Sequence, residues 1–332
     1  MRTFLERDII SGIQAQYEGQ KGEGLIKGIG DDCAVFRKEG NDLFLITIDT
    51  LVEGVHFDLS WHPPHLLGRK AASVNISDIS AMAGTPRFAL LSLALPDPSA
   101  ANWLDDFLSG FRSVLEEFGV ILIGGDTVKS GRGAMFSICM TGEVGENRIL
   151  FRSGARPNDI IWVAGRLGEA GAGLALCQNG RAGERNDWQG LVRAHLDPKA
   201  QVRLGTLLGK SGLASAMIDL SDGLATDLAH LCKESGIAGE IDADRIPMSA
   251  ELVAAARELQ VSPLDWAIRG GEDYLLLFTA ASEHGEALQL VAKEAKAEIF
   301  PVGRIFVGKG VFLLTGKNRE EISYQGFDHF RG

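Results

Sequence analysis

The stretch "LFLITIDTLVEGVHF", residues 43–57, combines the pattern of a buried strand with an acidic residue at its end. Leu43 to Ile48 form a continuous apolar run of the kind that a buried strand shows. The run ends on Asp49, and His56 follows shortly after. One aspartate at a strand end is ordinary turn chemistry. The chain repeats this arrangement elsewhere. The repetition predicts several strands whose terminal carboxylates meet at one site.

Strand and helix patterns alternate on both sides of this stretch. In the first half we expect strands at 43–49, 88–96, 120–126 and 135–144, and helices at 67–84 and 101–119. In the second half we expect strands at 159–165, 214–219, 270–280 and 310–316, helices at 171–180, 222–232 and 283–297, and a polar linker near 181–190. A Pro-Asn-Asp turn at 157–159 separates the halves. The pattern predicts an α/β (α+β) protein with domains at 1–150 and 151–332.

One of these helices, 101–119, has a clear apolar face. Its large side chains recur at helical spacing and are expected in the core: Leu104, Phe107, Leu108, Phe111, Val114, Leu115 and Phe118. A length of 332 residues also suits two domains better than one core.

The composition excludes several classes of protein. A net charge of −11 without a basic block argues against nucleic acid as a partner. The longest uncharged apolar run is too short to cross a bilayer, and acidic residues interrupt the first ten positions, so neither a membrane span nor a signal peptide is expected. Four well-separated cysteines without a CxxC pair suggest free thiols in a reducing, cytoplasmic setting.

Carboxylates recur at strand ends and beside glycine. They occur in "GIGDDCA" (Asp31, Asp32), "TIDT" (Asp49), "NISDIS" (Asp78), "IGGDT" (Asp126), "IDLSDG" (Asp219, Asp222) and "GGEDY" (Glu272, Asp273). Any one of these acidic motifs by itself is more simply explained as a turn. His62 and His65 lie beside two prolines, which suggests that they are loop residues. Together, without a Cys/His ligand set, the acids predict a site for hard cations such as Mg²⁺. If Ser221 or a neighbour caps the following helix, Asp219 and Asp222 lie at a helix N-terminus, where phosphate also binds.

Mg²⁺ is usually held by a few carboxylates together with substrate phosphates, which points to phosphoryl chemistry. The common phosphate loop is absent: "GTLLGKS" at 205–211 is one residue too short and lies in a helical pattern. "GIGDD" lacks the third glycine of a dinucleotide fingerprint, so an oxidoreductase has little support.

The ordered motifs "GIGDDCAV", "TIDTLVEGVHF", "AASVNISDISAMAGTPR", "LIGGDT", "RSGARPND", "IDLSDGLATDL", "GGEDYLLLFT" and "GFDHF" resemble those of the thiamine-monophosphate kinase family. This family belongs to the aminoimidazole-ribonucleotide synthetase-like ATP enzymes. The resemblance runs from about residue 28 to the end. It implies a two-domain α/β homodimer in which the N-terminal sheets pair, and an enzyme that uses ATP and several Mg²⁺ ions to phosphorylate thiamine monophosphate.

The same resemblance implies roles for individual residues. The metal ligands would be Asp32, Thr47, Ile48, Asp49, Asp78, Asp126, Asp219 and Asp222, with Ile48 able to offer only its backbone carbonyl. Gly125, Asp126, Arg152 and Ser221 would contact ATP, whereas His56, Glu272 and Tyr324 would contact the thiamine phosphate. The residues central to catalysis would be Asp49, Asp126 and Asp219.

Other members of the superfamily fit less well. A selenophosphate synthetase would need a reactive Cys or Sec near the N-terminus beside a Lys, but the first cysteine here, Cys33, sits inside "GIGDDCA". A hydrogenase-maturation dehydratase would end in a cysteine, and this chain ends in "HFRG". A purine-synthesis synthetase, which would lack the "GGEDY" and "DHF" pair, and a non-catalytic nucleotide- or metal-binding module remain the alternatives.

Overall fold

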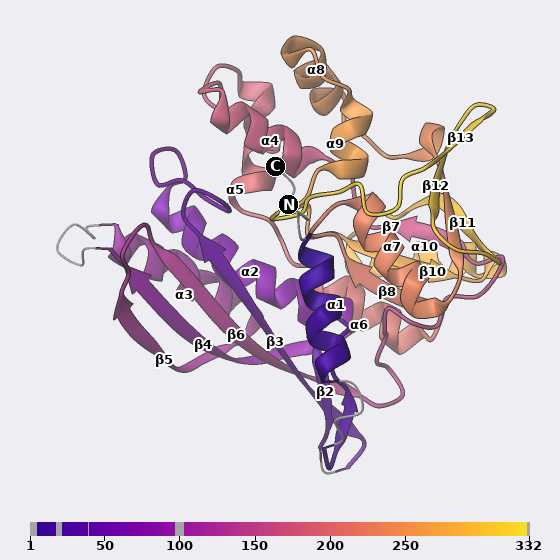
Figure 1. The fold of residues 1–332 in the computed structure, drawn as a ribbon, viewed down its shortest axis with the longest axis horizontal. Helices are drawn as coiled ribbons and strands as arrows, with labels where there is room; N and C mark the ends of the chain where they lie inside the picture. The colour runs from indigo at the N-terminus through magenta and orange to yellow at the C-terminus, as the bar shows by residue number, and fades with distance from the viewer. Residues whose placement is uncertain (1–4, 18–21, 39, 97–102, 331–332) are drawn as a thin grey trace.

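The computed structural model describes residues 5–17, 22–38, 40–96 and 103–330. Two β-sheets form its frame, with helices packed on them (Figure 1). The strands of the N-terminal sheet end at Gly145, and those of the C-terminal sheet begin at Ile160. This layout agrees with the expected α/β arrangement, while the domain boundary near residue 150 stays a prediction.

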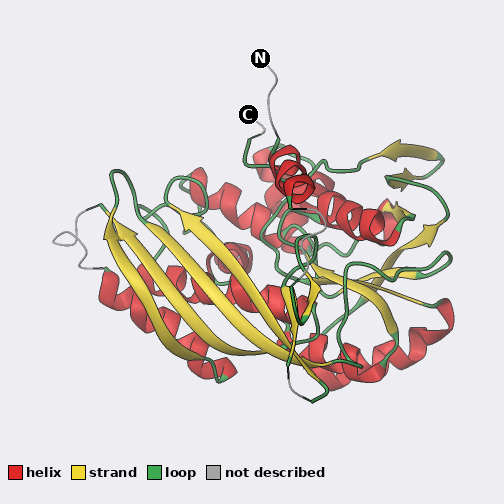
Figure 2. Cartoon of the chain, turned by 60° about the horizontal axis from the view of Figure 1, so that its bottom comes forward, coloured by secondary structure: helices red, strands yellow, loops and turns green. Residues whose placement is uncertain are grey.

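The N-terminal sheet has six strands in the order β1-β2-β3-β6-β4-β5. They are β1 (Leu25–Lys27), β2 (Ala34–Arg37), β3 (Asp42–Val52), β4 (Thr85–Leu95), β5 (Ile121–Lys129) and β6 (Met135–Gly145). Helices α2 (Pro64–Ala81) and α3 (Leu104–Phe118) cover one face. In Figure 2 the other face is turned to the viewer and is open, and Ile48 and Leu90 on it are 65% and 41% exposed.

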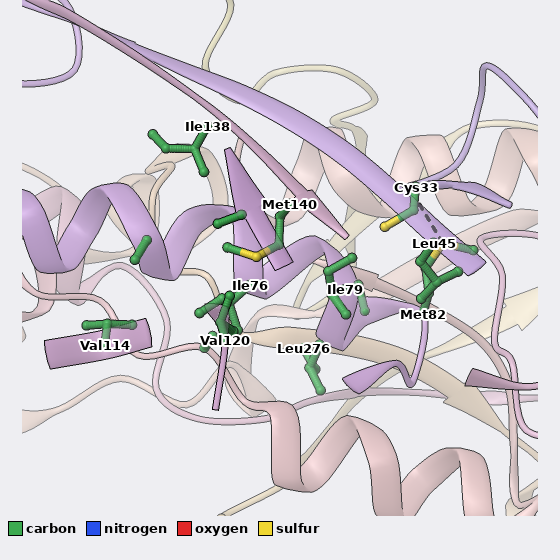
Figure 3. Close-up of a cluster of buried hydrophobic side chains, with 14 of the residues drawn as sticks. Cys33, Leu45, Ile76, Ile79, Met82, Val114, Val120, Ile138, Met140 and Leu276 are labelled. Atoms are coloured by element: carbon green, nitrogen blue, oxygen red, sulfur yellow. Dashed lines mark hydrogen bonds between the residues drawn. The ribbon is translucent and has the colours of Figure 1, made fainter. Parts of the chain in front are cut away.

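The covered face of this sheet carries the largest apolar core. Ile76 and Ile79 of α2, Val114 of α3, and Ile138 and Met140 of β6 lie in one cluster of buried side chains (Figure 3). The predicted aromatic face of the 101–119 helix is confirmed, because its side chains are buried in this core or packed against it. The first two residues of that predicted helix lie outside the described residues.

Helices α2 and α3 touch through two glycines. A Cβ atom at Gly68 would lie 1.9 Å from the carbonyl oxygen of Phe107, and one at Gly110 would lie 1.8 Å from that of His65. No side chain fits at either position. Helix α2 is thereby held between α3 and the C-terminal half, where it also packs against α5, α6 and β8. It contacts strands of both sheets.

The C-terminal sheet has seven strands in the order β13-β12-β9-β11-β7-β10-β8. They are β7 (Ile160–Val163), β8 (Ala214–Asp219), β9 (Ala238–Asp242), β10 (Leu276–Ala280), β11 (Phe300–Phe306), β12 (Val311–Thr315) and β13 (Asn318–Glu321). The helices are α1 (Glu6–Gln16) before the first sheet, and α4 (Glu169–Gln178), α5 (Gln189–Leu196), α6 (Val202–Ser211), α7 (Leu224–Ser235), α8 (Ala250–Leu259), α9 (Pro263–Arg269) and α10 (Gly285–Ala295). Short 3₁₀ helices lie at Asn186–Trp188, Ala243–Arg245 and Ser282–His284.

Two strands continue past the aspartates that we expected at their ends. β3 runs to Val52, because the residues after Asp49 pair with the start of β6. β5 runs to Lys129, because the residues after Asp126 pair with the end of β4. Both carboxylates are therefore carried inside strands, and the prediction of strand-terminal positions was wrong for them. It is confirmed for Asp219, the last residue of β8.

Other expectations also need correction. The strand expected at 270–280 covers only Leu276–Ala280, because the backbone before it turns through positive φ at Glu272 and Tyr274. The linker near 181–190 contains a 3₁₀ turn and the first residues of α5. His62 lies in the loop before α2, as expected, but it is buried, and its Nε2 lies 3.2 Å from the carbonyl oxygen of Leu196. His65 lies in α2.

No helix in the described part of the chain is both long and apolar enough to span a membrane.

Candidate active site

A cavity of about 480 Å³ opens between the two halves of the chain. Its walls come from β3 and the loop after it, from α2 and α4, from the turn that follows β8, from the α9–β10 loop and from the C-terminal segment. Asp49, Asp78 and Asp222 line it together with Glu272 and His56. The structure therefore brings residues from distant motifs into one site.

The core of the site is a group of buried carboxylates. One oxygen from each of Asp32, Asp78 and Asp219 lies within 4.8 Å of the other two. Hydroxyl donors fix two of them: Thr47 Oγ1 donates to Asp78 Oδ2 at 2.6 Å, and Ser77 Oγ donates to Asp219 Oδ2 at 2.6 Å. Three of the expected metal-binding residues thus meet, with Thr47 beside them.

These carboxylates resist ionisation. Burial, followed by the charge of Asp32, raises the pKa of Asp219 to about 8 and that of Asp49 to about 6. Burial and the Asp49 carboxylate raise the pKa of Asp78 well above its usual range. Burial and Glu6 raise the pKa of Asp222 to about 7. Removal from water disfavours each anion, and neighbouring acids add to this effect.

Arg152 supplies positive charge at the edge of the group. Its Nη2 donates to Asp32 Oδ1 at 2.6 Å, and its backbone N–H donates to Asp31 Oδ1 at 3.1 Å. Burial opposes charging of Arg152, but the carboxylates, led by Asp32, raise the pKa of its guanidinium. Lys27 Nζ lies 3.6 Å from Asp31 Oδ2, but Asp32 Oδ2 is buried without a hydrogen-bond partner, and these two cations cannot neutralise the whole cluster. Such oxygens suit a hard divalent cation, so the residues present fit Mg²⁺.

The turn after β8 is organised differently from our expectation. Gly223, at φ 104°, precedes α7, and no side chain caps the helix, so neither Ser221 nor Asp222 is the cap. Instead Asp227 Oδ2 accepts the backbone N–H groups of Asp222 and Gly223 at 3.1 and 3.0 Å. Asp227 thus holds the turn in shape, and Ser221 and Asp222 line the cavity.

Glu272 lies at another wall, within a buried ion-pair network. The ammonium of Lys70 is 2.7 Å from Glu272 Oε1, and His195 Nδ1 is 3.0 Å from Glu272 Oε2. Lys70 is fully buried. Burial alone would raise the pKa of Glu272, but Lys70 and His195 hold it well below its usual range. Burial lowers the pKa of His195, and the Lys70 charge adds to this. Glu272 is therefore a fixed anion.

His56 and Tyr324, the other two residues expected to contact the thiamine phosphate, lie in different surroundings. His56 lines the cavity, and its Nδ1 accepts the backbone N–H of Val52 at 3.0 Å. Burial and His329 lower its pKa. Tyr324 is not among the residues that line the cavity: its ring lies 5.2 Å from that of His230, and the Arg7 guanidinium lies 5.1 Å from its centre.

Asp126 is not brought to the carboxylate cluster within the chain. It is exposed on the edge strand β5 opposite Ser92, with β4 and β6 between it and β3. Three strand spacings amount to about 14 Å. Its neighbour Gly125 leaves no room for a side chain, since a Cβ there would lie 1.9 Å from the carbonyl oxygen of Leu91. Ile48, which was expected to bind metal through its backbone carbonyl, has a side chain that is 65% exposed.

Several residues at the site were not predicted from the sequence. They are Lys70 and His195 beside Glu272, Asp227 beneath the turn, and Trp266, Phe327 and His329 in the cavity wall. Asp227 was detectable, because an acid in the first turn of a helix that follows a glycine turn is a familiar N-terminal pattern. Nothing local distinguishes Lys70 from an exposed lysine.

Comparisons with known proteins agree with this architecture. The family model for the AIR synthase related protein N-terminal domain matches residues 30–144, and that for its C-terminal domain matches residues 156–315. These two matches define the class of protein. The thiamine-monophosphate kinase of Buchnera aphidicola (subsp. Acyrthosiphon pisum) is 37% identical over 308 residues, covering 92% of this chain and 93% of that protein. The Escherichia coli K12 enzyme of that name is 36% identical over 305 residues, 91% of each chain.

A solved structure described as AaThiL complexed with AMPPCP and TMP superimposes with a TM-score of 0.83, at 32% identity and with 98% of each chain covered. The chain therefore belongs to the thiamine-monophosphate kinase family, within the AIR synthase related proteins. The family expected from the motifs and the expected two-domain fold are both confirmed.

Proposed function

We propose that this protein transfers the γ-phosphoryl group of ATP to thiamine monophosphate, yielding ADP and thiamine diphosphate by direct in-line transfer assisted by Mg²⁺. The observation that carries the proposal is a single cavity with buried carboxylates at one wall and the fixed anion Glu272 at another. The family of named kinases, and the nucleotide analogue and TMP named in the related structure, support the choice of substrates.

Asp32, Asp49, Asp78, Asp219 and Asp222 would hold the metal ions, with Thr47 and the backbone carbonyl of Ile48 as additional contacts. When bound, Mg²⁺ would offset the repulsion between the two phosphate groups that must meet. The role of the protein is then to position these groups and to exclude water.

The acceptor needs no general base. A phosphate monoester has its second pKa near ~6, so it is largely a dianion at neutral pH and can attack directly. His56 is accordingly proposed as an acceptor contact whose orientation is set by the Val52 N–H. Arg152 and Ser221 would bind the ATP phosphates, since the guanidinium fork suits phosphate oxygens and Ser221 lines the cavity.

The stability of the metal-free protein is expected to fall as pH rises. The folded-state pKa values of Asp49, Asp222 and Asp219 are raised from 3.8 to about 6, 7 and 8, so between these limits the folded state binds more protons than the unfolded state. Ionisation then favours unfolding from pH ~4 to ~8. Mg²⁺ should reverse this trend by binding the anions. Thermal unfolding with EDTA or Mg²⁺ across this range is the measurement, and a Mg²⁺ effect that is no larger at pH 8 than at pH 5 would contradict it.

We further propose a homodimer that joins the open faces of the N-terminal sheets. Apolar side chains on the face of the sheet that no described helix covers, Ile48 and Leu90 among them, are suited to burial against a second copy. The edge strand β5 would then bring Gly125 and Asp126 towards the partner's site, which would explain a carboxylate on an exposed edge. In this arrangement Asp126 and Gly125 contact the metal ions and ATP across the interface.

A charge on this face should separate the dimer. We expect Leu90→Lys to elute as a monomer and to lose most kinase activity, because burying an unpaired ammonium is strongly unfavourable. The matched control is Leu290→Lys on α10, where the side chain is 70% exposed. Light scattering coupled to size exclusion measures the mass. A wild-type monomer with full activity would exclude this dimer.

The reaction itself is tested with purified protein, Mg²⁺, ATP and thiamine monophosphate, following thiamine diphosphate by chromatography. Free thiamine and aminoimidazole-type substrates serve as parallel acceptors. Product from the monophosphate alone is the expected result, and ATP binding without product would favour a non-catalytic module. The proposed compartment is the cytoplasm, in keeping with four free cysteines.

A further inference from the structure

We infer that a second cavity of the protein binds a phosphate monoester that carries a small apolar group. This cavity, of about 540 Å³, lies between α2 and α3 of the N-terminal half and α6, α10 and the β7–α4 loop of the C-terminal half. None of the described residues lines both this cavity and the candidate active site. The second cavity is therefore a separate site, and the inference does not depend on the proposed function.

The second cavity has a surplus of positive charge, although the whole chain carries a net charge of −11. Five basic and three acidic side chains line it: Arg69, Arg166, Lys199, Arg203 and Lys296 together with Glu117, Glu169 and Glu298. Two of the acids already have partners, since Glu117 pairs with Arg69 and Glu298 pairs with Arg166. A hollow with this balance of charge attracts anions.

Three of the basic side chains are available to a ligand. Lys199, Arg203 and Lys296 form no ion pair with any residue in the described part of the chain. Lys199 and Arg203 lie four positions apart at the start of α6, and Lys296 lies at the end of α10, which packs against α6. A phosphate group has several oxygen acceptors, so it can bind more than one of these donors at once.

The first turn of α6 adds backbone donors to the same wall. Gln201 is the N-cap residue, but its side chain is held elsewhere: its Nε2 donates to the carbonyl oxygen of Ala164 at 2.6 Å, and its Oε1 accepts the N–H of Leu276 at 2.9 Å. No side chain caps α6, so the N–H groups of Arg203 and Leu204 lack a side-chain acceptor among the described residues. Such a helix start favours an anion.

Ser73 gives an independent indication of a ligand. It lies on α2, is only 3% exposed and lines the second cavity. Its hydroxyl has no hydrogen-bond partner within the described ranges. Buried hydroxyl groups are nearly always hydrogen-bonded, so a missing partner needs an explanation. A phosphate oxygen in the cavity would supply that partner from the ligand.

The remaining walls indicate that the ligand is more than a free phosphate ion. Phe118, Leu204 and Leu275 line the second cavity with apolar surface, and a single phosphate group would fill only a small part of its volume. Ligand sites of this size combine apolar walls with a few polar groups that orient the ligand. The phosphate would lie at the start of α6, and the apolar group would contact these three side chains.

Phenyl phosphate is a suitable probe, titrated in calorimetry against the full-length protein in EDTA. Without Mg²⁺ the carboxylates of the candidate active site repel anions, so binding there does not interfere. We expect Lys199→Gln and Arg203→Gln each to weaken binding by about tenfold, and Ser73→Ala by about threefold. Lys210→Gln is the matched control, because Lys210 is exposed at the other end of α6 and is not among the residues lining the cavity.

Two further ligands test the chemical class. Methyl phosphate should bind more weakly than phenyl phosphate, because it lacks the apolar group, and phenol should show no binding. Equal affinity for methyl and phenyl phosphate would refute the apolar contact. No binding of phenyl phosphate by wild type overturns the inference. The same holds for unchanged affinity in Lys199→Gln and Arg203→Gln, and for an equal loss in Lys210→Gln, which would indicate unspecific attraction to surface charge.

Discussion

The Asp49→Asn variant is expected to lose about 10²- to 10³-fold in turnover while remaining folded. Asp49 lies in the middle of β3, at the cavity, and its backbone N–H donates to Asn75 Oδ1 at 3.1 Å. The substitution keeps the shape of the side chain and this backbone bond but removes the charge. Mg²⁺ would then lose a charged oxygen ligand in the cavity where the phosphates must be neutralised.

The substitution should not lower the stability of the folded state, because the ionised Asp49 carboxylate destabilises that state when no metal is bound. Burial and the neighbouring Asp32 raise the pKa of Asp49 to about 6, so its ionised form is unfavourable there. We expect the metal-free variant to unfold at or above the wild-type temperature and the stabilisation by Mg²⁺ to shrink. Asp42→Asn, at the exposed start of the same strand, is the control and should change neither quantity. A variant with near-normal turnover would remove Asp49 from the proposed mechanism.

The carboxylates of the site were predictable because their signals are local. "GIGDD" and "IDLSDG" combine acids with glycine, and Asp32 of the first and Asp219 of the second, at the end of β8, lie close to Asp78. Strand ends were less predictable, since pairing decides them. Thr50 to Val52 continue β3 because Met135 to Ser137 of β6 lie opposite, and the position of that partner cannot be found from residues 43–57.

Long-range partners explain the remaining omissions. Lys70 is 202 positions before Glu272 in the chain, and only the packing of α2 against the C-terminal half brings them together. The same holds for Phe327, whose backbone meets Asp222 across more than a hundred residues. The resemblance selected Tyr324 in this segment, whereas the cavity wall is formed by Phe327 and His329. Short motifs predicted the carboxylates that lie together at the cavity, whereas the apolar residues that line it depend on tertiary packing.

The Lys70→Met variant is expected to be severely destabilised, by about 3–5 kcal/mol, because it leaves the Glu272 carboxylate without its ammonium partner. Lys70 is fully buried in α2, its Nζ lies 2.7 Å from Glu272 Oε1 and it also donates to the carbonyl oxygen of His56 at 3.4 Å. Methionine fills a similar volume, so the lost charge is the main change. The midpoint of urea unfolding is the measurement, with exposed Lys309→Met as the control.

The double variant Lys70→Met/Glu272→Gln distinguishes this cause from lost packing. If the penalty comes from an unpaired anion, neutralising Glu272 should recover a large part of the lost stability, since a buried pair can be replaced as a unit at little cost. Acceptor binding should nevertheless stay weak in the double variant, because the fixed anion is gone. Additive losses from the two substitutions would mean that Lys70 acts through packing alone and that contact with the neutral imidazole of His195 is enough to hold the Glu272 anion. The Lys70–Glu272 ion pair thus stabilises the packing of α2 against the C-terminal half and also fixes the negative charge proposed to contact the acceptor.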